Sequence, residues 1–122
     1  MPRVFLIGHD IAFSKKLRAS FEVELGFEVY SDEEDGVKAI KKAAKVNSDL
    51  IILEMGSSPE NSFRLVEALK SILPKVPLFL VTEQHGVQSE KEALTRGVDA
   101  VFEKGQDYAA LLLNAQAAVD LA

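Results

Sequence analysis

Short hydrophobic runs alternate with longer segments of mixed polarity along the whole chain. The runs RVFLIG, DLIIL, LFLVT and AVFE are mostly apolar, which is typical of strands buried on both faces of a sheet. The run FEVYS alternates apolar and polar residues instead, which predicts a strand with one exposed face at the edge of the sheet. The five predicted strands cover residues 3–8, 27–31, 49–53, 78–82 and 100–103.

Each run is followed by a segment in which hydrophobic residues recur at the three- and four-residue spacing of an amphipathic helix. Gly26 and Gly97 are expected to end the first and fourth helices. The second helix is expected to open at Asp35–Gly36, and Asn61 or Ser62 to cap the third. The residues expected to face the core are Phe13, Leu17 and Phe21 in the first helix, Val37, Ile40 and Ala44 in the second, Phe63, Val66, Leu69 and Leu73 in the third, and Tyr108, Leu111, Leu112, Ala115 and Val119 in the fifth.

Five strand–helix repeats predict an α/β fold, in which a parallel sheet with right-handed crossovers carries helices on both faces. No linker, low-complexity tract or sequence repeat interrupts the pattern, and 122 residues suffice for one hydrophobic core but not for two. We therefore expect a single domain over residues 1–122. The chain ends soon after the last predicted helix, so a domain excised from a longer protein with an output domain stays an open alternative.

The composition narrows the classes of function. Hydrophobic residues make up 48% and charged residues 27%, as in a globular protein, and no apolar run approaches the roughly 20 residues that span a bilayer. The absence of cysteine excludes disulfides, thiol catalysis and cysteine–metal sites, and it fits a reducing cytoplasm. A net charge of −5 gives no general attraction to nucleic acid or anionic lipid. We interpret one basic cluster as the solvated face of a helix: Lys38, Lys41, Lys42 and Lys45.

Candidate functional residues follow the predicted strands. In an open parallel sheet, ligands bind beyond the carboxyl ends of the strands, at the point where the strand order reverses. The residues that emerge there are His9 and Asp10 after the first strand, Glu54 after the third, Thr82 and Glu83 at the end of the fourth, and Lys104 after the fifth. The sequence lacks the glycine-rich patterns of the common phosphate-binding loops, so nucleotide binding of those kinds is not expected.

This set of residues, in this order and spacing, resembles the receiver domains of two-component response regulators. VFLIGHD stands where that family has a strand ending in two acids, and SDLIILE where it has the phosphorylated Asp. EDGVKAI, LFLVTE and RGVDAVFEKG resemble the opening of the second helix, the Thr-bearing strand and the strand leading to the family's Lys. The resemblance covers essentially the whole chain and implies a flavodoxin-like (βα)5 fold with strand order 2-1-3-4-5.

The resemblance also implies roles for individual residues. In the family an Asp accepts a phosphoryl group from a histidine kinase, Mg²⁺ neutralises the transferring charge, and Thr and Lys contact the phosphoryl oxygens. Thr82 and Lys104 match the phosphoryl-reading positions, and Asp10 matches the second acid of the metal-binding pair. His9 replaces the first acid, which weakens Mg²⁺ binding, and Glu54 replaces the phosphorylated Asp. The extra methylene moves the carboxylate by about 1.5 Å, whereas phosphoryl transfer depends on positions to within about 1 Å.

These departures predict a pseudo-receiver: a signalling domain, not an enzyme, that needs no cofactor and acts through protein contacts independently of phosphorylation. A working phosphotransfer receiver that uses Mg²⁺ stays an alternative, and a metal-binding, hydrolase-like site at His9, Asp10 and Glu54 is a weaker one. Glu54 itself has two readings, a resident negative charge that imitates activation or an ion-pair partner that neutralises Lys104. We favour an N-cap for Asp10 and an exposed loop position for His9.

Family members usually bind partners at the surface of the fourth helix, fifth strand and fifth helix. The resemblance gives that surface residues from 87 to 108 in this chain. We therefore expect protein partners there, and neither membrane association nor direct nucleic-acid binding by this domain.

Overall fold

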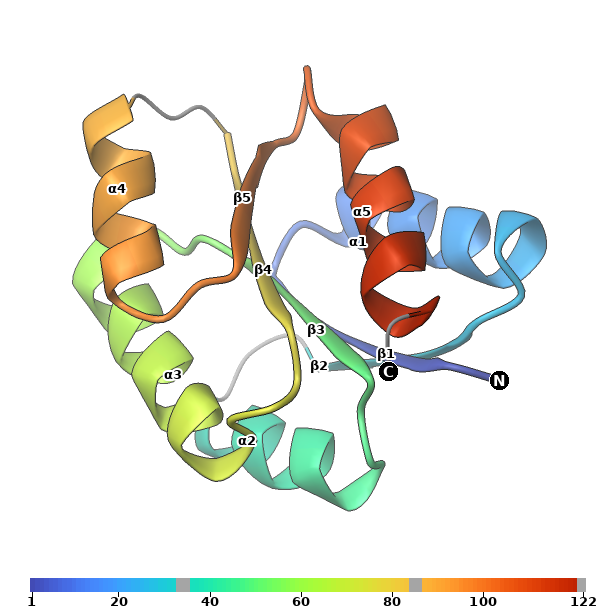
Figure 1. The fold of residues 1–122 in the computed structure, drawn as a ribbon, viewed down its shortest axis with the longest axis horizontal. Helices are drawn as coiled ribbons and strands as arrows, with labels where there is room; N and C mark the ends of the chain where they lie inside the picture. The colour runs from blue at the N-terminus through green and yellow to red at the C-terminus, as the bar shows by residue number, and fades with distance from the viewer. Residues whose placement is uncertain (33–35, 84–86, 121–122) are drawn as a thin grey trace.

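The computed structural model of the chain describes residues 1–32, 36–83 and 87–120. Its five strands form one fully parallel sheet in the order β2-β1-β3-β4-β5, drawn in Figure 1. The strands are β1 (Arg3–Ile7), β2 (Glu28–Asp32), β3 (Leu50–Glu54), β4 (Leu78–Thr82) and β5 (Ala100–Glu103). The predicted flavodoxin-like architecture is therefore confirmed, including FEVYS at one edge of the sheet.

Helices cover both faces of the sheet (Figure 1). The helices are α1 (Ile11–Ala19), α2 (Gly36–Lys45), α3 (Pro59–Ile72), α4 (Val87–Thr95) and α5 (Tyr108–Asp120). One core joins α1 and α5 to the sheet through Leu17, Leu111 and Ala115. A second core joins α2, α3 and α4 to the opposite face through residues such as Ala39, Phe63 and Ala93, drawn from separate helices. Because side chains alternate along each strand, neighbouring residues of β3 feed opposite cores, Ile52 the first and Ile51 the second.

Three local features differ from the expectations. The first helix does not continue as an α-helix but changes to a π-helical turn over Ser20–Glu24, before Gly26 ends it at a φ of 71°. The third helix begins earlier than predicted, because Ser58 is its N-cap and Pro59 its first residue. In α2 the inward face is formed by Ala39 and Ala43, with Ile40 partly buried against the core, while Val37 is 62% exposed.

The start predicted for the second helix at Asp35 lies outside the described residues. Among the residues that are described, no helix is both long and apolar enough to cross a membrane. The parallel arrangement brings the carboxyl ends of all five strands to one edge of the sheet, which is where the candidate side chains follow.

Candidate functional site

Glu54 is the last residue of β3, and its side chain is folded back over the end of β1. The side chain is 6% exposed and therefore largely removed from water. It packs directly over Gly8, where an added Cβ would lie 2.9 Å from the Glu54 Cβ and 3.0 Å from Oε1. Contacts that short do not occur between ordinary side chains, so the position of Glu54 requires glycine at residue 8.

Both oxygens of the Glu54 carboxylate have partners. Oε1 accepts hydrogen bonds from the backbone N–H groups of His9 and Asp10, each at 2.8 Å. Oε2 is buried and makes an ion pair with the ammonium of Lys104. A carboxylate held by two N–H donors and a cation is well satisfied as an anion, which offsets the cost of taking its charge out of water.

Lys104 lies at the centre of an acidic cluster that joins three different loops. Its Nζ is 3.0 Å from Asp10 Oδ2 and 3.0 Å from Glu83 Oε1, in addition to the Glu54 ion pair, and it lies 5.0 Å above the centre of the Phe13 ring. Burial lowers the pKa of this ammonium, since its side chain is 12% exposed, but the three carboxylates outweigh that effect and raise the pKa well above its ordinary value. Lys104 is thus a permanent cation at any physiological pH.

Asp10 has two structural partners. One oxygen, Oδ1, accepts a hydrogen bond from the Phe13 N–H at 3.1 Å, so Asp10 is the N-cap of α1, as predicted. The other oxygen faces Lys104. The Phe13 N–H first, and then the Lys104 ammonium, hold the pKa of the Asp10 carboxyl below its ordinary value.

His9 lies at the outer side of this cluster. Its side chain is 63% exposed, as expected for a loop residue, while Nδ1 lies 3.1 Å from Glu54 Oε1. The imidazole therefore covers the buried carboxylate on the side facing solvent. Its backbone N–H and its ring both contact the same oxygen atom.

Thr82 ends β4 and is buried at 6% exposure. Its carbonyl accepts a hydrogen bond from the Lys104 N–H at 2.9 Å, which places the two residues beside each other across β4 and β5. Its side chain lines a groove of about 450 Å³ between α3 and α4. The structure thus brings Asp10, Glu54, Thr82, Glu83 and Lys104 to one edge of the sheet, where the sequence placed them.

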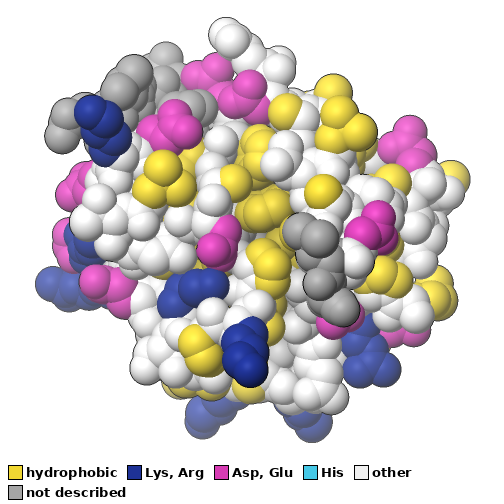
Figure 2. All heavy atoms as spheres, viewed as in Figure 1, with side chains coloured by type: hydrophobic (Ala, Val, Ile, Leu, Met, Phe, Trp, Pro, Cys, Tyr) yellow, Lys and Arg dark blue, Asp and Glu magenta, His cyan; other side chains and the backbone are white. Residues whose placement is uncertain are grey.

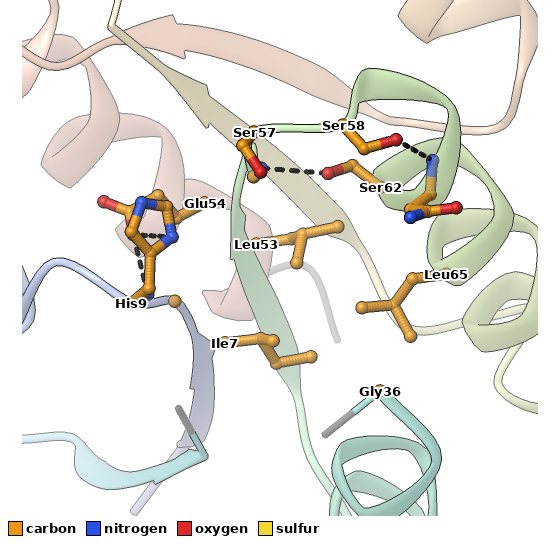
Figure 3. A pocket seen from close by; sticks show the side chains of 12 residues that line it. Ile7, His9, Gly36, Leu53, Glu54, Ser57, Ser58, Ser62 and Leu65 are labelled. Atoms are coloured by element: carbon orange, nitrogen blue, oxygen red, sulfur yellow. Dashed lines mark hydrogen bonds and ion pairs between the residues drawn. The ribbon is translucent and has the colours of Figure 1, made fainter. Parts of the chain in front are cut away.

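A second cavity, of about 530 Å³, lies on the His9 side of Glu54, at the switch point between β1 and β3. In Figure 3, Leu53 lies between the His9–Glu54 pair and the serines near the start of α3. Ile7 and Leu65 lie below it, on the side of Gly36. Those serines already serve the backbone: the Ser62 hydroxyl accepts from the Gly56 N–H at 2.9 Å, and Ser58 caps α3. The cavity therefore has an apolar floor and polar walls. Glu54 lines the cavity and also belongs to the charged cluster around Lys104.

The donors at the strand ends do not fit a Mg²⁺ ion. Such an ion requires several oxygen ligands in near-octahedral geometry, whereas here a lysine ammonium lies among the three carboxylates. Within the described part of the chain, no group of three or more His, Asp or Glu side chains could hold a metal ion. The metal-binding role suggested for His9 and Asp10 stays a prediction.

Comparison with known proteins supports the architecture. No protein-family model and no curated protein sequence matches the chain. A two-component response regulator from Clostridium difficile is similar in structure, with a TM-score of 0.85, 23% identity, and coverage of 98% of this chain and 97% of that one. The Vibrio cholerae chemotaxis protein CheY4 is similar with a TM-score of 0.82 and 22% identity, covering 97% of this chain and 98% of that one.

A Burkholderia pseudomallei response regulator, solved with a phosphorylated aspartic acid, a calcium ion and citrate, gives a TM-score of 0.81 at 17% identity and covers 98% of this chain and 69% of that one. The fold of this chain is therefore the fold of response-regulator receiver domains. Identities this low show the fold but not the chemistry of the site.

Two contributors to the site were not identified from the sequence. The backbone N–H groups that bind Glu54 carry no residue-type signal, so a pattern of side chains could not reveal them. Gly8 stood in the sequence as an isolated glycine directly after a strand, and a close approach of another chain segment is one of the reasons for a glycine there.

Proposed function

We propose that this chain is a receiver-like signalling domain of the response-regulator type that acts through protein contacts and does not depend on phosphorylation. The observation that supports this most is the state of Glu54. One of its oxygens is held by the His9 and Asp10 N–H groups and the other by the Lys104 ammonium, so the carboxylate is a resident anion rather than an exposed nucleophile. Reaction at Glu54 would require displacing those partners, which would leave buried donors and a buried cation unsatisfied.

The pairing of Glu54 with Lys104 is compatible with both roles considered for Glu54. One is a negative charge that imitates activation, and the other is an ion-pair partner that neutralises Lys104. A carboxylate carries a charge of about −1, against nearly −2 for a phosphoryl group, so it imitates the activated state incompletely. A tight ion pair also holds Lys104 in one place permanently. We propose that the cluster fixes one conformation of the strand-end loops, and that signalling is controlled by which partners are present.

Partner binding is proposed at α4, β5 and α5, by resemblance to receiver domains. Helix α5 contains no Lys or Arg over Tyr108–Asp120, and its Leu113 is 72% exposed. Leu94 on α4 is 45% exposed. In Figure 2, hydrophobic side chains gather over the middle of the view, where Figure 1 draws β5 and α5. An apolar surface of this kind suits a protein partner or an attached output domain in the cytoplasm.

Treatment with acetyl phosphate and Mg²⁺, followed by intact-mass spectrometry, tests the proposal. We expect no added phosphoryl mass on the wild-type chain, because Glu54 is longer than Asp and both its oxygens are engaged. The double variant Glu54→Asp with His9→Asp provides a matched comparison, since it restores both missing acids without altering Thr82 or Lys104. Stoichiometric labelling of the wild-type chain would overturn the proposal.

A working phosphotransfer receiver is the second candidate, because Thr82, Lys104 and Asp10 do lie together at the strand ends. Beryllofluoride with Mg²⁺ imitates an acyl phosphate and would distinguish the two. Amide chemical-shift changes concentrated at Asp10, Thr82 and Lys104 would favour this candidate. An unchanged spectrum at millimolar beryllofluoride would favour a domain that works without phosphorylation.

A further inference from the structure

The groove between α3 and α4 is separate from the cavity beside His9 and lies on the other side of the charged cluster. Its volume is about 450 Å³. The floor is apolar, with Phe63 from α3, Leu80 from β4, Val101 from β5, and Met55 from the loop after β3. Val101 is a small side chain on the edge strand and is partly exposed, so β5 does not fill the space under α4. The groove is therefore a pre-formed apolar slot, within the size range of binding pockets.

Among the described residues that line the groove, the charged ones are both acidic. They are Glu83 and Glu92, and none of the described lining residues is Lys, Arg or His. Glu92 makes no ion pair with another described residue. Glu83 is bound to Lys104, but its side chain is still 80% exposed. Long cationic side chains place an apolar stem along hydrophobic surface and keep the charged head at a polar rim. An acidic rim above an apolar slot is the complement of such a side chain.

Ion pairs fix the carboxyl end of α4 to α3, the two helices that form the groove. Arg96, just beyond α4, binds Glu60 at 2.9 Å and Glu67 at 3.1 Å on α3, and its guanidinium lies 5.0 Å from the centre of the Phe63 ring. The slot thus does not need to form on binding, because this clamp already holds α4 against α3. A pre-organised slot loses little entropy when it is filled.

We propose that this groove binds a basic side chain, Arg in the first instance, presented by a hydrophobic segment of a partner protein. The apolar stem lies on Phe63 and Val101, and the guanidinium pairs with Glu92 and Glu83. The planar fork of Arg suits two carboxylates better than the compact ammonium of Lys does. The inference rests on the proposed function, because it supplies the chemistry of the partner that a contact-driven signalling domain requires.

Glu83 gives the groove a connection to the buried cluster. The same carboxylate reaches Lys104 at 3.0 Å and lines the groove. A guanidinium arriving at Glu83 competes with Lys104 for it, and Lys104 then relies more on Asp10 and Glu54. Partner binding is in this way coupled to the loops at the strand ends, with no phosphoryl group involved.

An NMR titration of the ¹⁵N-labelled chain tests the proposal with the capped peptide acetyl-Leu-Arg-Leu-amide. We expect weak binding, about 1 mM, with chemical-shift changes centred on Met55, Leu80, Glu92 and Val101. The same peptide with citrulline, a neutral isostere of Arg, is expected to bind about fivefold more weakly. Equal binding of the citrulline peptide, changes centred elsewhere, or no change at about 10 mM peptide would each overturn the proposal.

Variants of the chain sharpen the test. Glu92→Gln is expected to weaken binding about threefold, whereas Glu24→Gln, which removes the same charge from the distant π-helical turn, leaves it unchanged. Val101→Phe fills the slot without altering charge and is expected to abolish the shifts. Equal affinity of the Glu92→Gln and Glu24→Gln variants would count against the groove.

The titration contains neither a phosphoryl donor nor Mg²⁺. A failure to bind peptide therefore overturns the groove alone, and labelling by acetyl phosphate overturns phosphorylation independence alone.

Discussion

Lys104 and Arg96 are each bound by several carboxylates, but in different surroundings. Lys104 is 12% exposed, and one of its partners, Glu54, is 6% exposed, so this pair is buried. Arg96 is 23% exposed and its partners Glu60 and Glu67 are 55% and 53% exposed, so its acids stay in water. The number of ion pairs is similar, but the consequence of breaking them is not, because a buried carboxylate that loses its partner cannot turn to solvent.

The position of the two clusters differs as well. Lys104 joins the loops that follow β1 and β4 to the last residue of β3, whereas Arg96 joins the surfaces of two neighbouring helices. The first cluster therefore decides the geometry of the functional edge, and the second decides only how α4 lies on α3.

The largest effect is expected for Lys104→Met. The variant leaves the buried Glu54 carboxylate without its cation and should lower the free energy of unfolding by about 3 kcal/mol at pH 7, measured by urea denaturation. Lys15→Met, on an exposed helix position, serves as the control for loss of a lysine. Adding Glu54→Gln to Lys104→Met should recover more than half of the loss, and a double variant no more stable than the single one would contradict this account.

A second, smaller effect is expected for Gly8→Ala. The new Cβ would lie within 3.0 Å of Glu54 atoms, so Glu54 must shift and the free energy of unfolding should fall by about 2 kcal/mol. In a Glu54→Ala background the same substitution should cost little, because the obstructing side chain is gone. Equal costs in both backgrounds would show that the strain arises elsewhere.

Arg96→Met is expected to destabilise the fold far less than Lys104→Met, since Glu60 and Glu67 stay hydrated after their partner is removed. Denaturation of the variant alongside Lys104→Met gives the comparison directly. A loss as large as that of Lys104→Met would remove the distinction between the two clusters.

The smallest effect concerns pH and Asp10. Its pKa is lowered in the folded chain, so its carboxylate contributes stability that is present above the unfolded value, about 3.9, and is lost as the pH falls through the folded value. The stability difference between the wild type and Asp10→Asn should therefore shrink on acidification below about pH 4.

Lys104 has the opposite sign, because its pKa is raised. Its contribution is complete below the unfolded value of about 10.4 and stays flat between pH 5 and 9. Urea midpoints measured across both ranges check the two statements together. A difference between wild type and Asp10→Asn that persists unchanged to pH 2 would contradict the role assigned to Asp10.

The sequence predicted most of the fold because buried parallel strands produce short apolar runs that can be recognised in a single sequence. It also predicted which residues meet, because parallel strands deliver their carboxyl ends to one edge. The inward face of α2 was predicted only in part. Ile40 does pack against the core, but Val37 is exposed and Ala39 and Ala43 are the buried residues, because alanines carry a weaker hydrophobic signal than valine.

Other differences had no sequence signal, or one that was missed. The Ser58–Pro59 pair, a cap followed by proline, does predict where α3 begins, and the caps predicted at Asn61 or Ser62 were wrong. The π-helical turn over Ser20–Glu24 changes hydrogen bonding without changing the hydrophobic spacing before it. The groove depends on the space left between Val101 and α4, and three-dimensional packing determines that space.

The strand order β2-β1-β3-β4-β5 bears on how the chain is made by the ribosome. Strand β2 adds beside β1, β3 adds on the other side of β1, and β4 and β5 follow outward in turn. Every strand thus pairs with one that has already been synthesised, and none must be inserted between two that are already joined. The sheet can grow in the order of translation, and Lys104, which completes the buried cluster, is synthesised after all three of its carboxylate partners.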